Sequence, residues 1–119
     1  MSVQKQAIEK YDGKVITYTC QKNVTVGDVI PLGVSMIGIA VNSGLVGEEI
    51  SVELEKVWTI KAKTTDVIAV GDVLYWDDEA KELTKEATDN VYAGRATSSK
   101  TAVAGTVDIK LNVWVLKKL

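Results

Sequence analysis

The sequence predicts a mostly β protein: a small single-domain β-barrel or sandwich with an internal pseudo-repeat, short helical turns at most and a flexible N-terminal arm. Three observations predict this class. Val, Ile and Thr make up about a third of the 119 residues, a composition that favours half-buried strands. Several segments alternate apolar and polar residues, and one hexapeptide occurs twice. This length supports one hydrophobic core, so we expect an arm over residues 1–14 and one β-rich domain over residues 15–119.

Two long segments carry the clearest strand pattern. In residues 50–60 every second side chain is apolar apart from Lys56, and residues 106–116 alternate in the same way. Shorter strands are expected at 15–20, 34–41, 73–76 and 92–97. Acidic residues 77–82 are typical of a hairpin tip, and residues 64–69 could form one capped helical turn.

The repeated hexapeptide is Thr25–Ile30 in the first copy and Ala69–Leu74 in the second, both with Val-Gly-Asp-Val at their centre. Each copy precedes a Gly-containing strand and then a long alternating strand. We expect the glycine to take a turn conformation that a residue with a Cβ avoids, and the aspartate to accept hydrogen bonds from backbone amides of the turn. The residues expected to have this structural role are Gly27, Asp28, Gly71 and Asp72.

The composition gives little support for catalysis. The chain has no His to activate a nucleophile, and its single cysteine, Cys20, shares a strand face with apolar residues and is expected to be buried. The acidic segment 77–82 lacks the ligand spacing of a known Ca²⁺ loop, and no phosphate-binding Gly-Lys-Ser/Thr sequence occurs. We therefore predict no catalytic residue, no cofactor and no metal ligand, and an enzyme would require a pocket with a strongly perturbed carboxylate.

Charge and hydropathy also limit the partners. A net charge of −2 gives no positive potential that would attract phosphate backbones, so nucleic acid is not expected as a partner. No apolar stretch approaches the ~18–20 residues that span a bilayer, and the first residues lack the apolar core of a signal peptide. We expect no membrane partner, and synthesis in the cytoplasm.

Two apolar residues near the C-terminus are candidates for an interface. If the register of residues 106–116 is right, Trp114 and Leu116 emerge from the polar face of the strand. They either form a contact patch or cover a second layer of the protein's own core. The polar arm at the N-terminus is either simply a free end or a segment that adds a strand to a partner's sheet.

Several turn and strand signatures together resemble a known family. They are Val26–Val29, the run Gly71–Asp77 with the return strand Lys81–Thr84, the segment Tyr92–Ala96 and the closing Val107–Asn112. This pattern, from Tyr11 to Asn112, resembles the small bacteriophage capsid cement or head decoration proteins, also known under an older label as predicted phage recombinases. Residues 113–119 look like an extension beyond the segment with which sequences of this family usually end. A recombinase ATPase would need a phosphate-binding loop and a longer chain, so that label is set aside.

The resemblance implies a non-enzymatic protein that binds the outer surface of the expanded capsid. It implies the phage major capsid protein as partner, homotrimers at threefold and quasi-threefold positions, stabilisation of the shell, and a place on the capsid exterior of the virion after synthesis in the bacterial host. The candidate interface residues are then Tyr11, Trp58, Trp76, Trp114 and Leu116. The alternative function is a small β-domain on a virion or cell surface that binds a carbohydrate or receptor, which would place exposed aromatic residues on one face.

Overall fold

The protein is all-β in the computed structural model, which describes residues 7 and 10–113. No helix occurs among these residues, so the mostly β prediction is confirmed. The alternating Val, Ile and Thr segments form short strands, each ended by a glycine or polar turn. In chain order they are β1 (Val15–Thr19), β2 (Val29–Leu32), β3 (Met36–Ala40), β4 (Glu49–Glu53), β5 (Val57–Lys61), β6 (Val73–Asp77), β7 (Glu82–Thr84), β8 (Val91–Ala96) and β9 (Thr106–Leu111).

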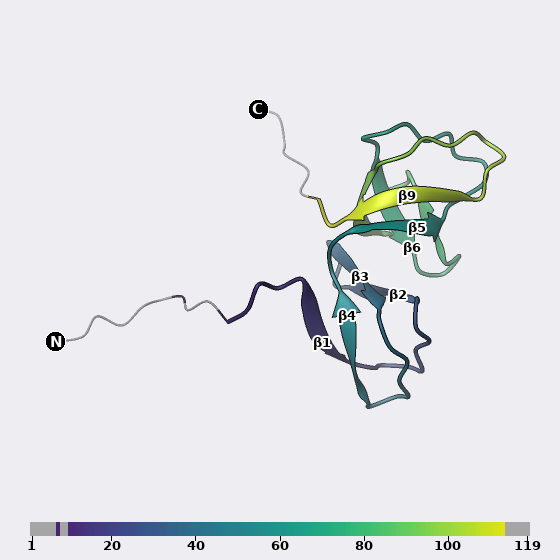
Figure 1. The fold of residues 1–119 in the computed structure, drawn as a ribbon. Coiled ribbons are helices and arrows are strands. Elements are labelled where there is room, and N and C mark those ends of the chain that lie inside the picture. The colour runs from purple at the N-terminus through teal and green to yellow at the C-terminus, as the bar shows by residue number, and fades with distance from the viewer. Residues whose placement is uncertain (1–6, 8–9, 114–119) are drawn as a thin grey trace.

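The strands form two antiparallel sheets that lie one above the other in Figure 1. The first has the order β1-β4-β3-β2 and the second the order β5-β9-β8-β6-β7. The edge strands of the second sheet approach each other, because Ala62, just after β5, forms a parallel bridge with Leu83 of β7. The second sheet therefore curls around its core without a full ladder closing it, an arrangement between the predicted barrel and sandwich.

The internal repeat is confirmed at the level of topology. We call residues 15–53 the first half and residues 57–111 the second half. Strands β1, β2, β3 and β4 of the first half occupy the same sheet positions as β5, β6, β8 and β9 of the second. Strand β7 is an addition that the first half lacks. The two halves are thus one four-stranded arrangement used twice, with an extra strand in the second copy.

The prediction of one long strand over residues 50–60 is wrong, because the chain passes from the first sheet to the second within this segment. Strand β4 ends at Glu53 and β5 begins at Val57. Between them Lys56 has a φ of 80°, in the left-handed region that breaks a strand. Its ammonium lies 3.1 Å from the Glu53 carboxylate. The lysine that interrupted the apolar face in the sequence therefore marks the crossing between the sheets.

Three further expectations differ from the structure in detail. Strand β9 ends at Leu111, and the expected continuation over residues 114–116 lies outside the described residues. Strand β2 was not among the predicted strands, because it is short and contains Pro31. Residues 64–69 form no helix; a turn closed by the Asp66 amide and the Lys63 carbonyl, 3.2 Å apart, begins there instead.

The single core expected from the length is divided into two clusters that share β3. Ile37 and Ile39 point into the larger cluster, which belongs mainly to the second half. Ala40 points the other way, into the smaller cluster of the first half. Gly38 faces the same way, and a Cβ there would collide with the side chain of Val52. Because successive side chains of a strand alternate in direction, β3 supplies bulky residues to one core and small residues to the other.

Asn112 fastens the end of the second half to the first. It has a φ of 56°, which turns the chain out of β9 and which asparagine tolerates better than most residues. Its side-chain oxygen accepts a hydrogen bond from the Ile37 amide at 3.0 Å, and its side-chain nitrogen donates to the Ile37 and Leu54 carbonyls, both at 2.8 Å. One amide therefore serves three backbone groups from two segments that lie far away in the sequence.

We predict that Asn112→Asp destabilises the protein by at least about 2 kcal/mol, measured by urea unfolding. Aspartate tolerates the same φ, so the change isolates the lost amide donors and places a negative charge beside two carbonyl oxygens. The matched control is Asn42→Asp. There the side-chain oxygen only accepts, from the Ser51 amide at 2.8 Å, and a carboxylate keeps that bond. Equal stability of the two variants would contradict the role given to Asn112.

Candidate functional site

The repeated hexapeptides form rigid turns at equivalent places of the two halves. In the first, Gly27 has a φ of 92°, the Asp28 amide donates to the Thr25 carbonyl at 3.0 Å, and the Thr25 amide donates to the Asp28 carboxylate at 2.9 Å. The Gly27 amide also bonds the Ala40 carbonyl at 2.8 Å, which ties the turn to β3. This is the conformation that the Val-Gly-Asp pattern predicts for its glycine and aspartate.

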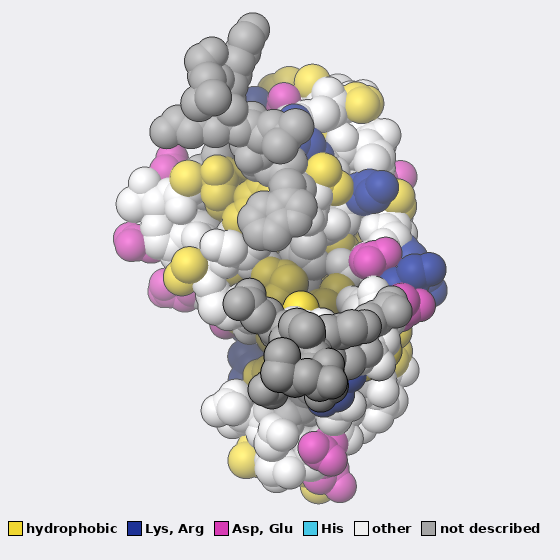
Figure 2. Space-filling model, turned by 90° about the vertical axis from the view of Figure 1, so that its left-hand side faces the viewer, with side chains coloured by type: hydrophobic (Ala, Val, Ile, Leu, Met, Phe, Trp, Pro, Cys, Tyr) yellow, Lys and Arg dark blue, Asp and Glu magenta, His cyan; other side chains and the backbone are white. Residues whose placement is uncertain are grey.

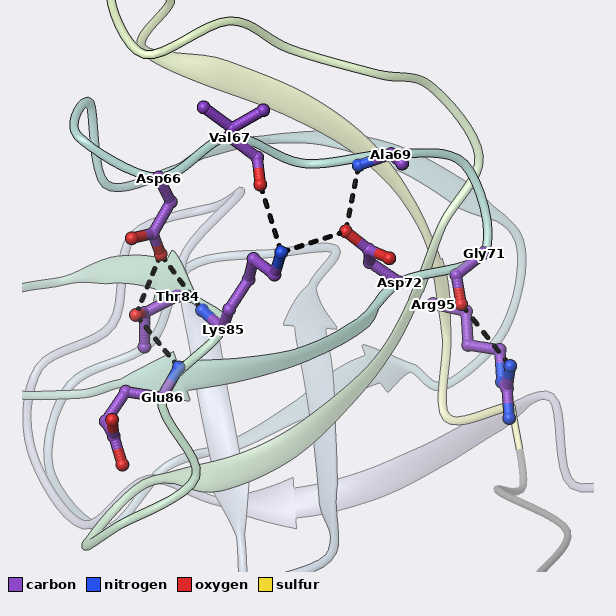
Figure 3. A network of polar contacts seen from close by, with 9 residues as sticks. All are labelled: Asp66, Val67, Ala69, Gly71, Asp72, Thr84, Lys85, Glu86 and Arg95. Carbon is purple, nitrogen blue, oxygen red and sulfur yellow. Dashed lines mark hydrogen bonds and ion pairs between the residues drawn. The ribbon is translucent and has the colours of Figure 1, made fainter. Parts of the chain in front are cut away.

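The second turn repeats this geometry. Gly71 has a φ of 93°, and the Ala69 amide donates to the Asp72 carboxylate at 2.9 Å (Figure 3). The Gly71 amide bonds the Ala96 carbonyl at 2.8 Å, as Gly27 bonds Ala40. The two turns are therefore held at both ends, by their own aspartate and by the neighbouring strand.

A third turn of the same kind was missed in the sequence. It is Leu45–Glu48, where Gly47 has a φ of 87° and the Leu45 amide donates to the Glu48 carboxylate at 2.6 Å. Glutamate in place of aspartate hid the repeat, and a search for Val-Gly-Asp/Glu would have found it. The first and third turns lie side by side, because the amide and carbonyl of Val24 bond those of Gly44 at 2.8 and 3.0 Å.

Each of the three turns exposes a valine at its tip. The exposed fractions are 58% for Val26, 63% for Val46 and 67% for Val70. The turn geometry needs the glycine and the acid but makes no use of the valine side chain. On the face that Figure 2 shows, hydrophobic side chains reach the surface in small groups between charged ones. Exposed apolar residues on rigid turns are suited to contact with another macromolecule.

A polar network fixes the second turn to the segment after β7. The Lys85 ammonium lies 3.3 Å from the Asp72 carboxylate and donates to the Val67 carbonyl at 3.1 Å (Figure 3). The Asp66 carboxylate accepts from the Thr84 hydroxyl and the Lys85 amide, both at 3.0 Å. The bond from the Ala69 amide, aided by Lys85, lowers the pKa of Asp72.

The predicted interface residues do not gather at one place. Tyr11 is exposed beside β1. Trp58 is half-buried against the larger core, with its indole N–H donating to the Glu55 carbonyl at 2.9 Å. Trp76 is buried in that core, and its indole N–H donates to the Asp78 carboxylate at 2.9 Å. The remaining two, Trp114 and Leu116, lie outside the described residues.

A groove of about 780 Å³ runs between the two halves. Its walls come from the end of β1, the loop after it and β2 on one side, and from β5 and β6 on the other. Lysines from both halves line it, namely Lys22, Lys61 and Lys81. The Lys81 ammonium lies 2.8 Å from the Asp78 carboxylate, and this bond raises the pKa of Lys81. Burial acts to raise the pKa of Asp78, but its bonds from Lys81 and Trp76 outweigh that effect and lower it.

In the described part of the chain, the free cysteine and the acidic side chains do not gather into one cluster. Cys20 is buried in the smaller core as a free thiol, as predicted. Residues 7 and 10–113 hold no group of three or more His, Cys, Asp or Glu side chains that could bind a metal ion. They also contain no helix long and apolar enough to span a membrane.

These features define a small two-sheet β protein that offers rigid turns, exposed valines and a groove as contact surfaces. Residues 10–111 match the protein family described as phage cement protein, and the chain belongs to that family. The family is structural, and membership associates the chain with the capsid of a phage virion. The comparisons found no matching curated protein and no matching solved structure.

We predict that Asp72→Asn makes the stability of the protein less dependent on pH. Because the folded-state pKa of Asp72 is lowered, its carboxylate stabilises the protein above the unfolded pKa, near 3.9, and this contribution is lost as pH falls through the folded value. The variant should melt at a lower temperature than the wild type at pH 7, and the difference should shrink below about pH 4. The control is Asp89→Asn, at an exposed site outside the three repeated turns, where asparagine tolerates the φ of 61° as aspartate does. A constant difference across this range would contradict the prediction.

Proposed function

We propose that this chain is a head decoration protein that binds the outer surface of the expanded phage capsid and stabilises the shell. The observation that carries the proposal is the family match over residues 10–111. The exposed valines on turns fixed by backbone and carboxylate bonds support it, since such turns present apolar contacts without a loss of loop entropy on binding. The protein is made in the bacterial host and joins the virion on the capsid exterior.

The stabilising effect follows from mass action. A protein that binds the expanded shell and no other form shifts the equilibrium toward that form, by about 2.7 kcal/mol per site at 100 times the Kd. We propose that it binds as homotrimers over threefold and quasi-threefold positions. A trimer that contacts three capsid subunits at once increases the effective concentration of each further contact, so weak individual contacts suffice.

The proposed contact residues differ in how they could act. Tyr11 is exposed and free to meet the shell directly. Trp58 and Trp76 are half-buried and buried, so they would act through the surfaces that they support. Trp114 and Leu116 remain candidates for contact between protomers or with the shell. The arm over residues 1–14 is proposed to add a strand to a sheet of the capsid.

The alternative, a carbohydrate- or receptor-binding module, requires exposed aromatic rings along one face. Among the described residues Trp76 is buried, Trp58 is half-buried, and Tyr75 and Tyr92 pack edge to face with ring centres 6.0 Å apart. The described aromatic residues therefore give this alternative little support.

We expect the purified protein to co-sediment with expanded capsids of the phage that encodes it and not with unexpanded capsids. Binding should saturate, and the bound shells should survive heating to a higher temperature than bare shells. Analytical ultracentrifugation of the free protein would show whether the trimer exists before binding. Absence of binding to either form of the capsid would overturn the proposed function.

We predict that Tyr11→Ala weakens binding to expanded capsids about tenfold or more, since exposed tyrosines are frequent energetic centres of interfaces. The melting temperature should not change, because this side chain belongs to neither core. Val34→Ala is the control, as it removes an exposed apolar side chain from the β2–β3 turn. Deletion of residues 1–10 tests the arm in the same assay. Wild-type affinity of both altered proteins would exclude the N-terminal contact.

A further inference from the structure

The two halves differ in one respect that the repeat makes visible. In the second half, β7 pairs with β6 and reaches across to the far edge of its sheet, where the Lys63 amide donates to the Leu83 carbonyl at 2.8 Å. Leu83 itself is fully buried in the larger core. The first half has no counterpart of β7, so no described strand lies between β1 and β2.

The position of the missing strand can be located by correspondence. The Cys20 amide donates to the Glu48 carbonyl, and the Ala62 amide donates to the Gly105 carbonyl, each at 2.9 Å. Cys20 therefore corresponds to Ala62, and the residue after it, Gln21, corresponds to Lys63. On the side of the first half, the groove between the halves is lined by Tyr18 and Gln21 and by β2. It lies at the place that a counterpart of β7 would fill.

Within residues 10–113, no strand pairs with the outer edge of β1. The Lys14 carbonyl accepts a hydrogen bond from the Leu54 amide. Because every second residue of an antiparallel strand bonds the neighbouring strand, the backbone amides and carbonyls of Ile16 and Tyr18 also face β4. The amides and carbonyls of Val15, Thr17 and Thr19 then point outward. Strand β1 has no charge, no proline and no bulge, the devices that commonly protect an edge.

The other edges are better protected. Strand β2 carries Pro31, which removes a donor from its outer side. Strand β7 has only three residues and includes Glu82. Strand β5, the counterpart of β1, carries Lys61 and has its end covered by β7. The end of this edge is covered by β7 in the second half, but no described strand covers it in the first half, which suggests that a strand from outside completes it.

The chemistry of the groove indicates what that strand carries. Its lining includes Val24 and Ile30, which are buried in the smaller core, so an apolar side chain that enters the groove would meet apolar neighbours, as Leu83 does in the other half. Its polar lining has three lysines against Asp28 and Asp78, and Asp78 is already bonded to Lys81. This balance favours an acidic segment.

The chain's own ends do not have this character. Residues 1–14 contain three lysines (Lys5, Lys10 and Lys14) against two acids (Glu9 and Asp12), and residues 113–119 contain two lysines and no acid. A terminal segment of a second copy would therefore bring positive charge to a groove lined with lysines.

We infer that the groove receives an extended segment of the capsid shell, with an apolar side chain flanked by acidic ones, which pairs with β1 and completes the first half. This inference rests on the proposed function.

The experiment measures binding of the full chain to expanded capsids for the wild type, Lys22→Glu and Lys110→Glu. Both lysines are exposed, but Lys22 lines the groove and Lys110 lies on β9 away from it. We expect Lys22→Glu to weaken binding at least fivefold at low salt and Lys110→Glu to bind like the wild type, with unchanged melting temperatures for both.

Hydrogen–deuterium exchange on the same complexes tests the pairing without a substitution. The outward amides of Val15, Thr17 and Thr19 should exchange at least tenfold more slowly on the capsid than in the free protein, while those of the exposed loop 86–89 should not change. Wild-type protein that binds with no such protection, or Lys22→Glu that binds like the wild type, would overturn the inference and leave the proposed function intact. Protection that appears without capsid as the protein concentration rises would assign the groove to a second copy and also overturn it. A wild type that does not bind would refute both.

Discussion

The fold depends on the burial of both faces of β3. Its residues Ile37 and Ile39 fill the larger core, while Gly38 and Ala40 allow the smaller core to approach the same strand. Asn112 then bonds both backbone groups of Ile37 from the opposite end of the chain. Because the strand and the asparagine meet at one residue, packing and hydrogen bonding hold the two halves together at the same point.

The repeated turns separate the residues that hold the backbone from the residues that lie at the surface. In each turn an acidic side chain and a glycine with positive φ satisfy the backbone locally, and a neighbouring strand or segment supplies the remaining bond. The turn is thus stable whatever side chain stands at its tip. A phage cement protein acts through its surface, and this arrangement separates residues that maintain the turn from residues available for contact.

Much of the architecture could be predicted from the sequence, because strand alternation and the Val-Gly-Asp turns depend on local physical chemistry. The β class, most strands, the repeat and the burial of Cys20 were all accessible in this way. The break at Lys56 was not, since the apolar alternation continues on both sides of it while the chain passes into another sheet. Local patterns do not specify which sheet a strand joins.

The candidate surfaces were harder to predict for a related reason. Tryptophan often anchors interfaces, but Trp76 is buried in the core and its indole N–H bonds the Asp78 carboxylate. Only the packing shows this. The groove is formed by β1, β2, β5 and β6, which are distant in the sequence, so no single motif describes it. The third turn could have been found, had glutamate been treated as equivalent to aspartate.

The sharing of β3 also restricts how the chain can be divided. A cut at Lys56 separates the two sheets cleanly in sequence, yet a fragment ending there would expose Ile37 and Ile39, and the fragment beginning there would lack two side chains of its own core. Neither piece is expected to be soluble when expressed alone. A split reporter built at this position would therefore recover its fold only when both pieces are present together, in spite of the apparent independence of the two copies.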